Sequence, residues 1–177
     1  VWFAYNEAKD PKDTEWILKD VSFEIKAGET LALIGATGAG KSSIINLIGR
    51  YYEINRGDIY IDGINIKDIE LNLLRKHISV VLQDVFLFSD TIYNNITLYS
   101  PDIKESQVID AAKNVGSHDF ISQLPGGYQY NVKERGALLS AGQRQLISFI
   151  RAYVHQPEIL ILDEATSSID SESEVLI

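Results

Sequence analysis

The sequence contains no cysteine and no methionine. Without cysteine the chain has no disulfide framework and no thiolate metal site, which favours a reducing compartment. No apolar stretch approaches the roughly 20 residues that a membrane-spanning helix needs, and the first residues do not resemble a signal peptide. Because methionine is absent, we expect the chain to be a fragment of a longer protein.

Basic residues are also scarce, since 16 Lys and Arg stand against 25 Asp and Glu for a net charge of −9. Proteins that bind duplex DNA through its phosphates usually carry a basic surface, so no nucleic-acid partner is expected. Any bound phosphate must be held by local backbone and one or two cations. With 177 residues, 45% of them hydrophobic, the chain suits one domain with a sizeable core, with or without an inserted lobe.

Three short apolar runs predict strands of a parallel sheet: residues 31–34, 78–82 and 159–162. Runs without polar alternation are typical of strands that are buried on both faces, as in parallel sheets. Asp62-Gly63 lies between two short apolar segments and predicts a two-residue hairpin. This hairpin would belong to a small antiparallel flap, which we expect to include residues 2–5 and 21–25.

Helical spacing of apolar residues predicts helices at 41–50, 104–115 and 143–154. No buried-strand pattern occurs between about residues 85 and 142, so this stretch is expected to form a helical lobe. The predicted fold class is therefore α/β, with a parallel-sheet core, an antiparallel β flap and an inserted α-helical subdomain at roughly 85–142. All of these parts belong to one predicted domain over residues 1–177.

Residues 35–42, Gly-Ala-Thr-Gly-Ala-Gly-Lys-Ser, fit the phosphate-binding pattern G-x-x-x-x-G-K-[ST] between a predicted strand and a predicted helix. Glycines let successive N–H groups face an anion, and the helix directs its N-terminal dipole at the same point. Lys41 would reach the β and γ phosphates and Ser42 would bind Mg²⁺. The alternative, a glycine-rich turn with a solvated lysine, fits the strand–loop–helix setting poorly. The predicted nucleotide contacts here are Gly35, Thr37, Gly38, Ala39, Gly40, Lys41, Ser42 and Ser43.

The apolar run 159–162 ends in Asp163 and Glu164. A carboxylate at the end of a strand beside a phosphate loop is suited to holding Mg²⁺ through water. Glu164, one residue further, would polarise a water aimed at the γ phosphate, an assistance worth about 10²–10⁴-fold. A strand that ends in Asp-Glu is by itself more often a solvated strand end, and the phosphate loop is what favours the functional interpretation.

Residues 139–143, Leu-Ser-Ala-Gly-Gln, precede a predicted helix. Ser140 and Gln143 fit a capping box, and a capped helix start beside Gly142 also suits an anion. With this segment the sequence resembles the nucleotide-binding domain of exporter-type ABC proteins, whose signature is LSGGQ. Ala141 replaces the first glycine of that signature. The resemblance covers essentially the whole chain and implies a P-loop NTPase (RecA-like) fold.

The resemblance also implies roles for single residues. Tyr5 matches the aromatic residue that stacks on adenine, and Gln83 matches the glutamine that touches Mg²⁺. Tyr5 alone would more often be a strand aromatic and Gln83 a surface amide, but their order along the chain favours the family roles. The implied catalytic residues are Glu164, Lys41 and Gln83, and the implied metal ligands are Ser42, Gln83 and Asp163. Further implied nucleotide contacts are Ser140, Gly142, Gln143, Asp163 and Asp170.

The resemblance further implies ATP and Mg²⁺ as cofactors and ATP hydrolysis as the activity. A second nucleotide-binding domain, identical or different, would bind head to tail. Two segments resemble exporter sequences that face coupling helices of a transmembrane domain: residues 84–96, and Val132–Gly136, where Lys133 replaces a glycine. We therefore expect a place at the cytoplasmic face of the cell membrane, with the fragment itself soluble.

Other classes predict different sequence features. A soluble ABC ATPase acting on nucleic acid or ribosomes would favour basic insertions, and a P-loop kinase or GTPase would lack residues 139–143. A nucleotide sensor without turnover would not need Glu164. His77, His118 and His155 are interpreted as surface or helix-end residues. None lies where the family has its switch histidine, so we expect the chain alone to be weakly active or inactive, and mostly monomeric.

Overall fold

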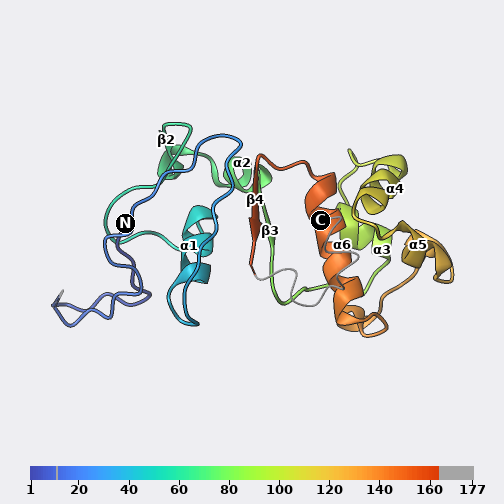
Figure 1. Cartoon of the computed structure of the whole chain (residues 1–177), viewed down its shortest axis with the longest axis horizontal. Coiled ribbons are helices and arrows are strands. Elements are labelled where there is room, and N and C mark those ends of the chain that lie inside the picture. The colour runs from blue at the N-terminus through green and yellow to red at the C-terminus, as the bar shows by residue number, and fades with distance from the viewer. Residues whose placement is uncertain (11, 164–177) are drawn as a thin grey trace. The chain divides into compact units, whose positions relative to one another are not determined.

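The computed structural model describes residues 1–10 and 12–163 (Figure 1). The chain divides into two compact units, Val1–Lys76 and the part that begins at His77. Each unit has its own cluster of buried apolar side chains. The two units are described separately.

The N-terminal unit contains helices α1 (Lys41–Ile48) and α2 (Leu71–Lys76) and the strands β1 (Tyr60–Ile61) and β2 (Ile64–Asn65). β1 and β2 pair antiparallel, as the Asp-Gly signal predicts. The turn residues Asp62 and Gly63 have φ angles of 48° and 78°. Positive φ at both positions matches the twist of a tight hairpin and explains why Asp-Gly is suited to this turn.

The first residues of the chain build the core of this unit. Trp2 donates its backbone N–H to the carbonyl of Arg56 at 2.9 Å, and Phe3 pairs with Leu18 through an isolated bridge. Phe3, Leu18 and Leu47 are almost fully buried together. Residues 2–5 therefore join the rest of the unit through single bridges, and not as a full strand of the predicted flap.

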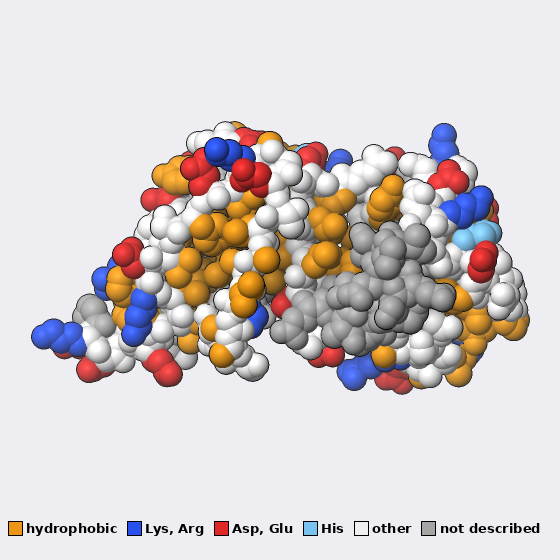
Figure 2. Space-filling model, in the orientation of Figure 1, with side chains coloured by type: hydrophobic (Ala, Val, Ile, Leu, Met, Phe, Trp, Pro, Cys, Tyr) orange, Lys and Arg blue, Asp and Glu red, His pale blue; other side chains and the backbone are white. Residues whose placement is uncertain are grey.

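Two predicted strands are absent from the described structure, and these predictions were wrong. Residues 21–25 and 31–34 carry no strand, and Ile34 is 95% exposed. An apolar run becomes a buried strand only where neighbouring strands accept its backbone hydrogen bonds, and no hydrogen bond between described residues joins 31–34 to a neighbouring strand. Apolar side chains are accordingly visible on the surface of this unit (Figure 2).

The second unit is built around a parallel pair of strands. β3 (Ile78–Val81) pairs with β4 (Ile159–Leu162) in the register Val81 opposite Leu162. The helices are α3 (Ile92–Thr97), α4 (Glu105–Asn114), α5 (His118–Gln123) and α6 (Ala141–Val154). Helix α6 packs against α3, α4 and β3, and its apolar residues form the centre of the core. The strands predicted at 78–82 and 159–162 are thus confirmed.

Helices α4 and α6 match their predicted positions to within one or two residues. Helix α6 begins with a reciprocal capping box, in which Ser140 Oγ accepts from the Gln143 N–H and Gln143 Oε1 accepts from the Ser140 N–H. Helix α4 ends before Gly116, whose φ is 70°. Glycine is favoured at such a left-handed position after a helix. Among the described residues, no helix is long and apolar enough to cross a lipid bilayer.

Candidate functional site

The glycine-rich loop leads directly into α1. Gly38 and Gly40 have φ angles of 82° and 92°, and Ala39 donates its N–H to the carbonyl of Ala36 at 3.1 Å. A Cβ atom on Gly40 would lie 2.7 Å from Cδ2 of the buried Leu18. Both the backbone conformation and the close approach therefore require glycine at position 40.

Lys41, the first residue of α1, folds back over the loop. Its ammonium group donates to the carbonyl of Gly35 at 2.7 Å and to that of Ala36 at 3.2 Å. The Lys41 ammonium thus lies against the glycine-rich loop, and the positive end of the α1 dipole points at the same loop. In an acidic chain, a lysine beside a helix start is an arrangement suited to a phosphate group.

Tyr5 is tied to the same helix. Its hydroxyl lies 3.1 Å from Oγ of Ser43 in the first turn of α1. The Tyr5 side chain nevertheless remains 48% exposed. The structure therefore brings the predicted adenine-stacking residue together with the predicted phosphate loop, although 38 residues separate Tyr5 from Ser43.

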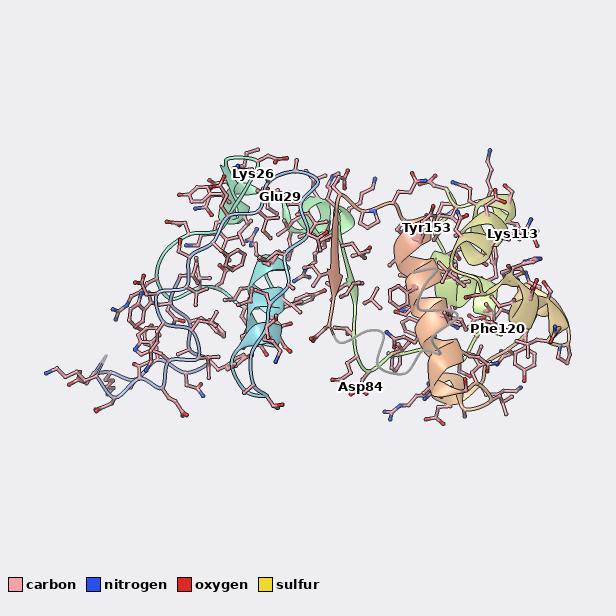
Figure 3. The ribbon with its side chains drawn as sticks, in the orientation of Figure 1. Lys26, Glu29, Asp84, Lys113, Phe120 and Tyr153 are labelled. Carbon is pink, nitrogen blue, oxygen red and sulfur yellow. The ribbon has the colours of Figure 1, made fainter. Side chains whose placement is uncertain are left out.

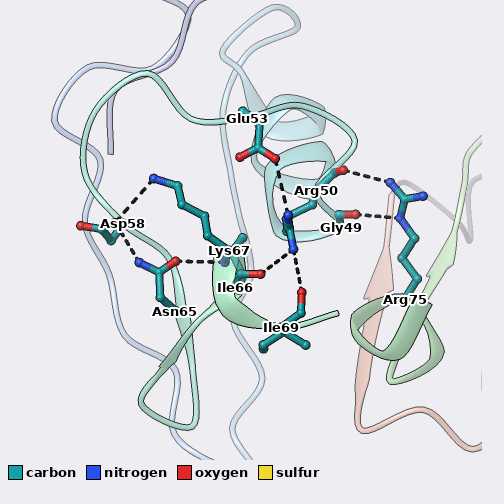
Figure 4. Close-up of polar contacts among 9 residues, drawn as sticks. All are labelled: Gly49, Arg50, Glu53, Asp58, Asn65, Ile66, Lys67, Ile69 and Arg75. Carbon is teal, nitrogen blue, oxygen red and sulfur yellow. Dashed lines mark hydrogen bonds and ion pairs between the residues drawn. The ribbon is translucent and has the colours of Figure 1, made fainter. Parts of the chain in front are cut away.

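The other end of α1 is held by two arginines that sequence reasoning missed (Figure 4). Arg75 of α2 donates from Nε to the carbonyl of Gly49 at 3.1 Å and from Nη2 to that of Arg50 at 2.9 Å. Arg50 in turn donates from Nη1 to the carbonyls of Ile66 and Ile69, both at 2.8 Å. The Arg75 bonds satisfy carbonyls after α1, and the Arg50 bonds join this end of the helix to residues 66–69.

A second group of predicted site residues lies at the carboxyl ends of β3 and β4. Asp163 donates its N–H to the carbonyl of Val81 at 2.9 Å, and Gln83 follows one residue after Leu82. Gln145 of α6 donates to the carbonyl of Leu82 at 3.2 Å and fixes this end of β3. Asp84, the next residue after Gln83, is labelled at this end in Figure 3. Glu164 and Asp170 lie outside the described residues.

The predicted metal ligands Ser42, Gln83 and Asp163 are all oxygen donors, as Mg²⁺ prefers. Among the residues that the structure describes, no group of three His, Cys, Asp or Glu side chains is placed to hold a metal ion. Ser42 belongs to the N-terminal unit and the other two belong to the second unit.

The predicted signature residues form the start of α6. Ser140 and Gln143 are the capping-box pair, and Gly142 lies in the first turn. Because Ser140 Oγ accepts the Gln143 N–H, its own hydrogen stays available for another acceptor. Arg144 donates to the carbonyl of Leu139 at 2.7 Å and fixes the residue before the cap.

The loop before α3 presents two aromatic side chains. Phe86 and Phe88 are both about half exposed and make an edge-to-face contact with centroids 5.1 Å apart, while Leu87 between them is buried. The buried Asn95 amide accepts from the Phe88 N–H and donates to the Phe88 carbonyl. Arg151 donates to the Asn95 carbonyl at 2.8 Å, and burial lowers the pKa of Arg151. The apolar residues in this stretch thus divide into core and surface.

The segment 132–136 lies beside this loop, since Val132 donates its N–H to the carbonyl of Asp90. Lys133, Glu134 and Arg135 are exposed, whereas Gly136 is buried. A Cβ atom on Gly136 would lie 2.9 Å from Cδ1 of Leu87, so glycine allows the two segments to approach.

The ABC transporter family description matches residues 18–167, which is most of the chain. The chain belongs to the ABC transporter family. This ABC chain is 53% identical over its full length to YknV of Bacillus subtilis, an uncharacterized ABC transporter ATP-binding protein, and covers 28% of that protein. It is 49% identical to a Staphylococcus aureus protein named as a candidate multidrug export ATP-binding/permease protein, of which it covers 30%.

A solved structure of a bacterial Atm1-family ABC exporter with ATP bound matches the whole ABC chain with a TM-score of 0.91 at 40% identity. The chain covers 30% of that exporter, so it spans less than a third of the relatives described here. The expected ABC ATP-binding domain of exporter type is confirmed, and with it a P-loop NTPase fold. None of these comparisons supports the nucleic-acid or ribosome alternative.

Proposed function

We propose that this ABC domain binds and hydrolyses ATP with Mg²⁺ and thereby powers an exporter. The observation that carries the proposal is the arrangement of the N-terminal unit, where Lys41 lies over the glycine-rich loop and Tyr5 is tied to the same helix. The adenine base would lie on Tyr5, and the Lys41 ammonium would leave the loop carbonyls and bind the triphosphate. The contacts to phosphate would come from the backbone of Gly35, Thr37, Gly38, Ala39 and Gly40 and from Ser42 and Ser43.

The chemistry would depend on further residues besides the phosphate loop. Ser42, Gln83 and Asp163 would hold Mg²⁺, which neutralises charge on the β and γ phosphates. Glu164 would orient the attacking water and accept its proton, and Lys41 and Gln83 would position the γ phosphate. Positioning and electrostatic stabilisation supply most of the rate in such phosphoryl transfers.

A second ABC domain would complete the site. Ser140, Gly142 and Gln143 of one copy would close over the γ phosphate held by the other, with Asp170 contributing to the same site. The free hydrogen of the Ser140 hydroxyl and the positive end of the α6 dipole both favour this contact. Since the signature acts from a second copy, we expect the chain alone to be mostly monomeric and to turn ATP over weakly or not at all.

The transmembrane partner would bind through the exposed Phe86 and Phe88 and the charged segment 133–135. One relative is named as an ATP-binding/permease protein, and this chain covers only 30% of it. Residues 85–142 would act as a helical subdomain that passes ATP-driven movement to coupling helices. The domain would thus work at the cytoplasmic face of the cell membrane.

Replacement of Lys41 by alanine tests the proposal. For the unchanged chain, Mg-ATP at 100 times its Kd should raise the free energy of unfolding by about 2.7 kcal/mol, because ligands that bind only the folded state stabilise it. Lys41→Ala should lose most of this stabilisation, measured by urea unfolding with and without Mg-ATP. Lys67→Ala, which removes only an exposed 3.7 Å ion pair with Asp58, is the control. Equal stabilisation of Lys41→Ala and the unchanged chain would defeat the assignment.

A further inference from the structure

Tyr5 contacts two other aromatic rings. Its ring centroid lies 4.8 Å from that of Phe3 at an interplanar angle of 77°, and 5.0 Å from that of Tyr52 at 82°. Phe3 and Tyr52 also contact each other, with centroids 5.9 Å apart. Edge-to-face geometry at these separations is favourable, so the three rings restrict one another's orientation.

Tyr52 reaches this cluster because the chain reverses after α1. Gly49 follows the helix, and a Cβ atom there would lie 2.7 Å from Cε2 of Tyr51. Arg50 then adopts a left-handed φ of 48°, and Tyr51 donates its N–H to the carbonyl of Asn46 at 2.8 Å. Tyr51 turns toward Arg75, which lies 4.5 Å from its ring centroid, while Tyr52 turns toward Tyr5.

One side chain, Asn55, holds the backbone before Tyr5 and a side chain after it. Asn55 Oδ1 accepts the N–H of Ala4 at 2.9 Å, and Asn55 Nδ2 donates to Glu7 Oε2 at 3.1 Å. The hydroxyl of Tyr5 is held separately by Ser43. Ring, hydroxyl and backbone of Tyr5 are therefore all fixed, while about half of the side chain stays accessible.

We propose that Tyr52 is a positioning residue that holds the Tyr5 ring in the orientation in which it receives a purine base. This inference rests on the proposed function, since it requires Tyr5 to contact the base. An aromatic platform that is ordered before binding loses less side-chain freedom when the ligand arrives. Tyr52 therefore increases affinity for the base and contributes nothing to affinity for the phosphates, which bind the loop at Gly35–Ser42.

The experiment compares two ligands in calorimetric titrations of the 177-residue chain: Mg-ATP, and inorganic triphosphate with Mg²⁺. Tyr52→Leu keeps apolar bulk and removes the aromatic contact, so its Kd for ATP should rise about three- to tenfold. Its Kd for triphosphate should stay unchanged. Tyr52→Phe keeps the ring and should bind ATP as the unchanged chain does. Tyr60→Ala, an exposed tyrosine on β1, is the control and should change neither Kd.

Two results would overturn the inference: an unchanged ATP affinity in Tyr52→Leu, or an equal weakening of ATP and triphosphate, which indicates general damage to the unit. If the unchanged chain bound ATP no better than triphosphate, the role of Tyr5 in the proposed function would fail, and this inference with it. The first two results leave the proposed function standing, so the two failures are distinguishable.

Discussion

Lys133 has a backbone conformation that ordinarily belongs to glycine. Its φ and ψ are 61° and −171°, and its N–H is bonded to Asn131 Oδ1 at 2.9 Å. For a residue with a Cβ atom this region costs on the order of 1–3 kcal/mol. Glycine adopts this conformation without that cost.

Lys133→Gly should therefore stabilise the chain. The relief of strain exceeds the extra freedom that glycine gives the unfolded chain, and we expect a net gain of about 1 kcal/mol in the free energy of unfolding, measured by urea denaturation. Lys113→Gly makes the same substitution inside α4 and should instead destabilise by about 1 kcal/mol. A loss of stability in both variants would contradict the strained conformation of Lys133.

Asp90 is a carboxylate surrounded by donors. Its carboxylate accepts hydrogen bonds from the Tyr99 hydroxyl, from the Thr91 N–H and from Asn94 Nδ2. These bonds, that of Tyr99 first, hold the pKa of Asp90 below its ordinary value of 3.8. A lowered pKa in the folded state means that the charged carboxylate stabilises the fold above the unfolded-state pKa. That contribution is lost as the pH falls through the folded-state pKa.

We expect Asp90→Asn to be less stable than the unchanged chain at neutral pH and the difference to shrink in acid. Urea midpoints measured from pH 7 to below pH 3.8 test this, with Asp102→Asn as an exposed control. Tyr99→Phe should also raise the Asp90 pKa, which carboxyl NMR titration reports. A stability difference that stays constant with pH would show that Asp90 acts through its shape and not its charge.

At the level of elements, α1 depends on its two ends. The glycine-rich loop and Lys41 lie at the start of α1. The Arg75 guanidinium donates to two carbonyls that follow the end of α1. An eight-residue helix is too short to be stable alone, so such tertiary contacts maintain it. The geometry of the phosphate loop thus depends on a residue of α2.

Arg75→Ala should lower the free energy of unfolding by about 1–2 kcal/mol, because two charge-assisted hydrogen bonds and the contact with Tyr51 are lost. Hydrogen exchange of the α1 amides should quicken more than that of α6, which belongs to the other unit. Arg75→Lys keeps the charge without the planar fork and should show most of the same loss. Unchanged exchange in α1 would remove Arg75 from this role.

The elements that the sequence predicted well are those with local signals. The Asp62-Gly63 hairpin, the capping box of α6 and the glycine after α4 are encoded within a few residues, and all three are present. The prediction of a strand at residues 31–34 failed because an apolar run does not encode its pairing partners. Helices α2, α3 and α5 have six residues each, too few to show a helical period.

The same difference between local signals and tertiary contacts holds for the candidate site. The phosphate loop is a contiguous motif, so its place before α1 was predictable from spacing alone. The contacts of Tyr5 with Ser43 and Tyr52 join residues about 40 or more positions apart. Such contacts arise from tertiary packing and have no signal in a single sequence.

At the level of the whole molecule, the chain has two units with separate cores, and each contains proposed magnesium ligands. Ser42 belongs to the first and Gln83 and Asp163 to the second. Under the proposed function, ATP would bind Tyr5 and the phosphate loop, and Mg²⁺ would also bind Gln83 and Asp163. ATP and Mg²⁺ would therefore protect different amides from hydrogen exchange.

Hydrogen exchange with and without a chelator measures this difference. ATP with EDTA should slow exchange in the amides of residues 35–43 only. ATP with Mg²⁺ should also slow exchange at 81–84 and 161–163, because Gln83 and Asp163 then bind the metal. The non-hydrolysable analogue of ATP serves as a control for turnover. Identical protection patterns in the two conditions would refute Gln83 and Asp163 as metal ligands.

The close approach of Gly40 to Leu18 limits which mutations of the Gly40 codon the fold can accept. Any single-base change in a glycine codon that alters the amino acid introduces a side chain or stops translation. At position 40 the Cβ atom of every such residue would lie 2.7 Å from Cδ2 of Leu18. The residue would also need a φ of 92°, which residues with a side chain rarely adopt. A lineage that loses this glycine is expected to require a compensating, smaller residue at position 18 and still to carry a distorted loop.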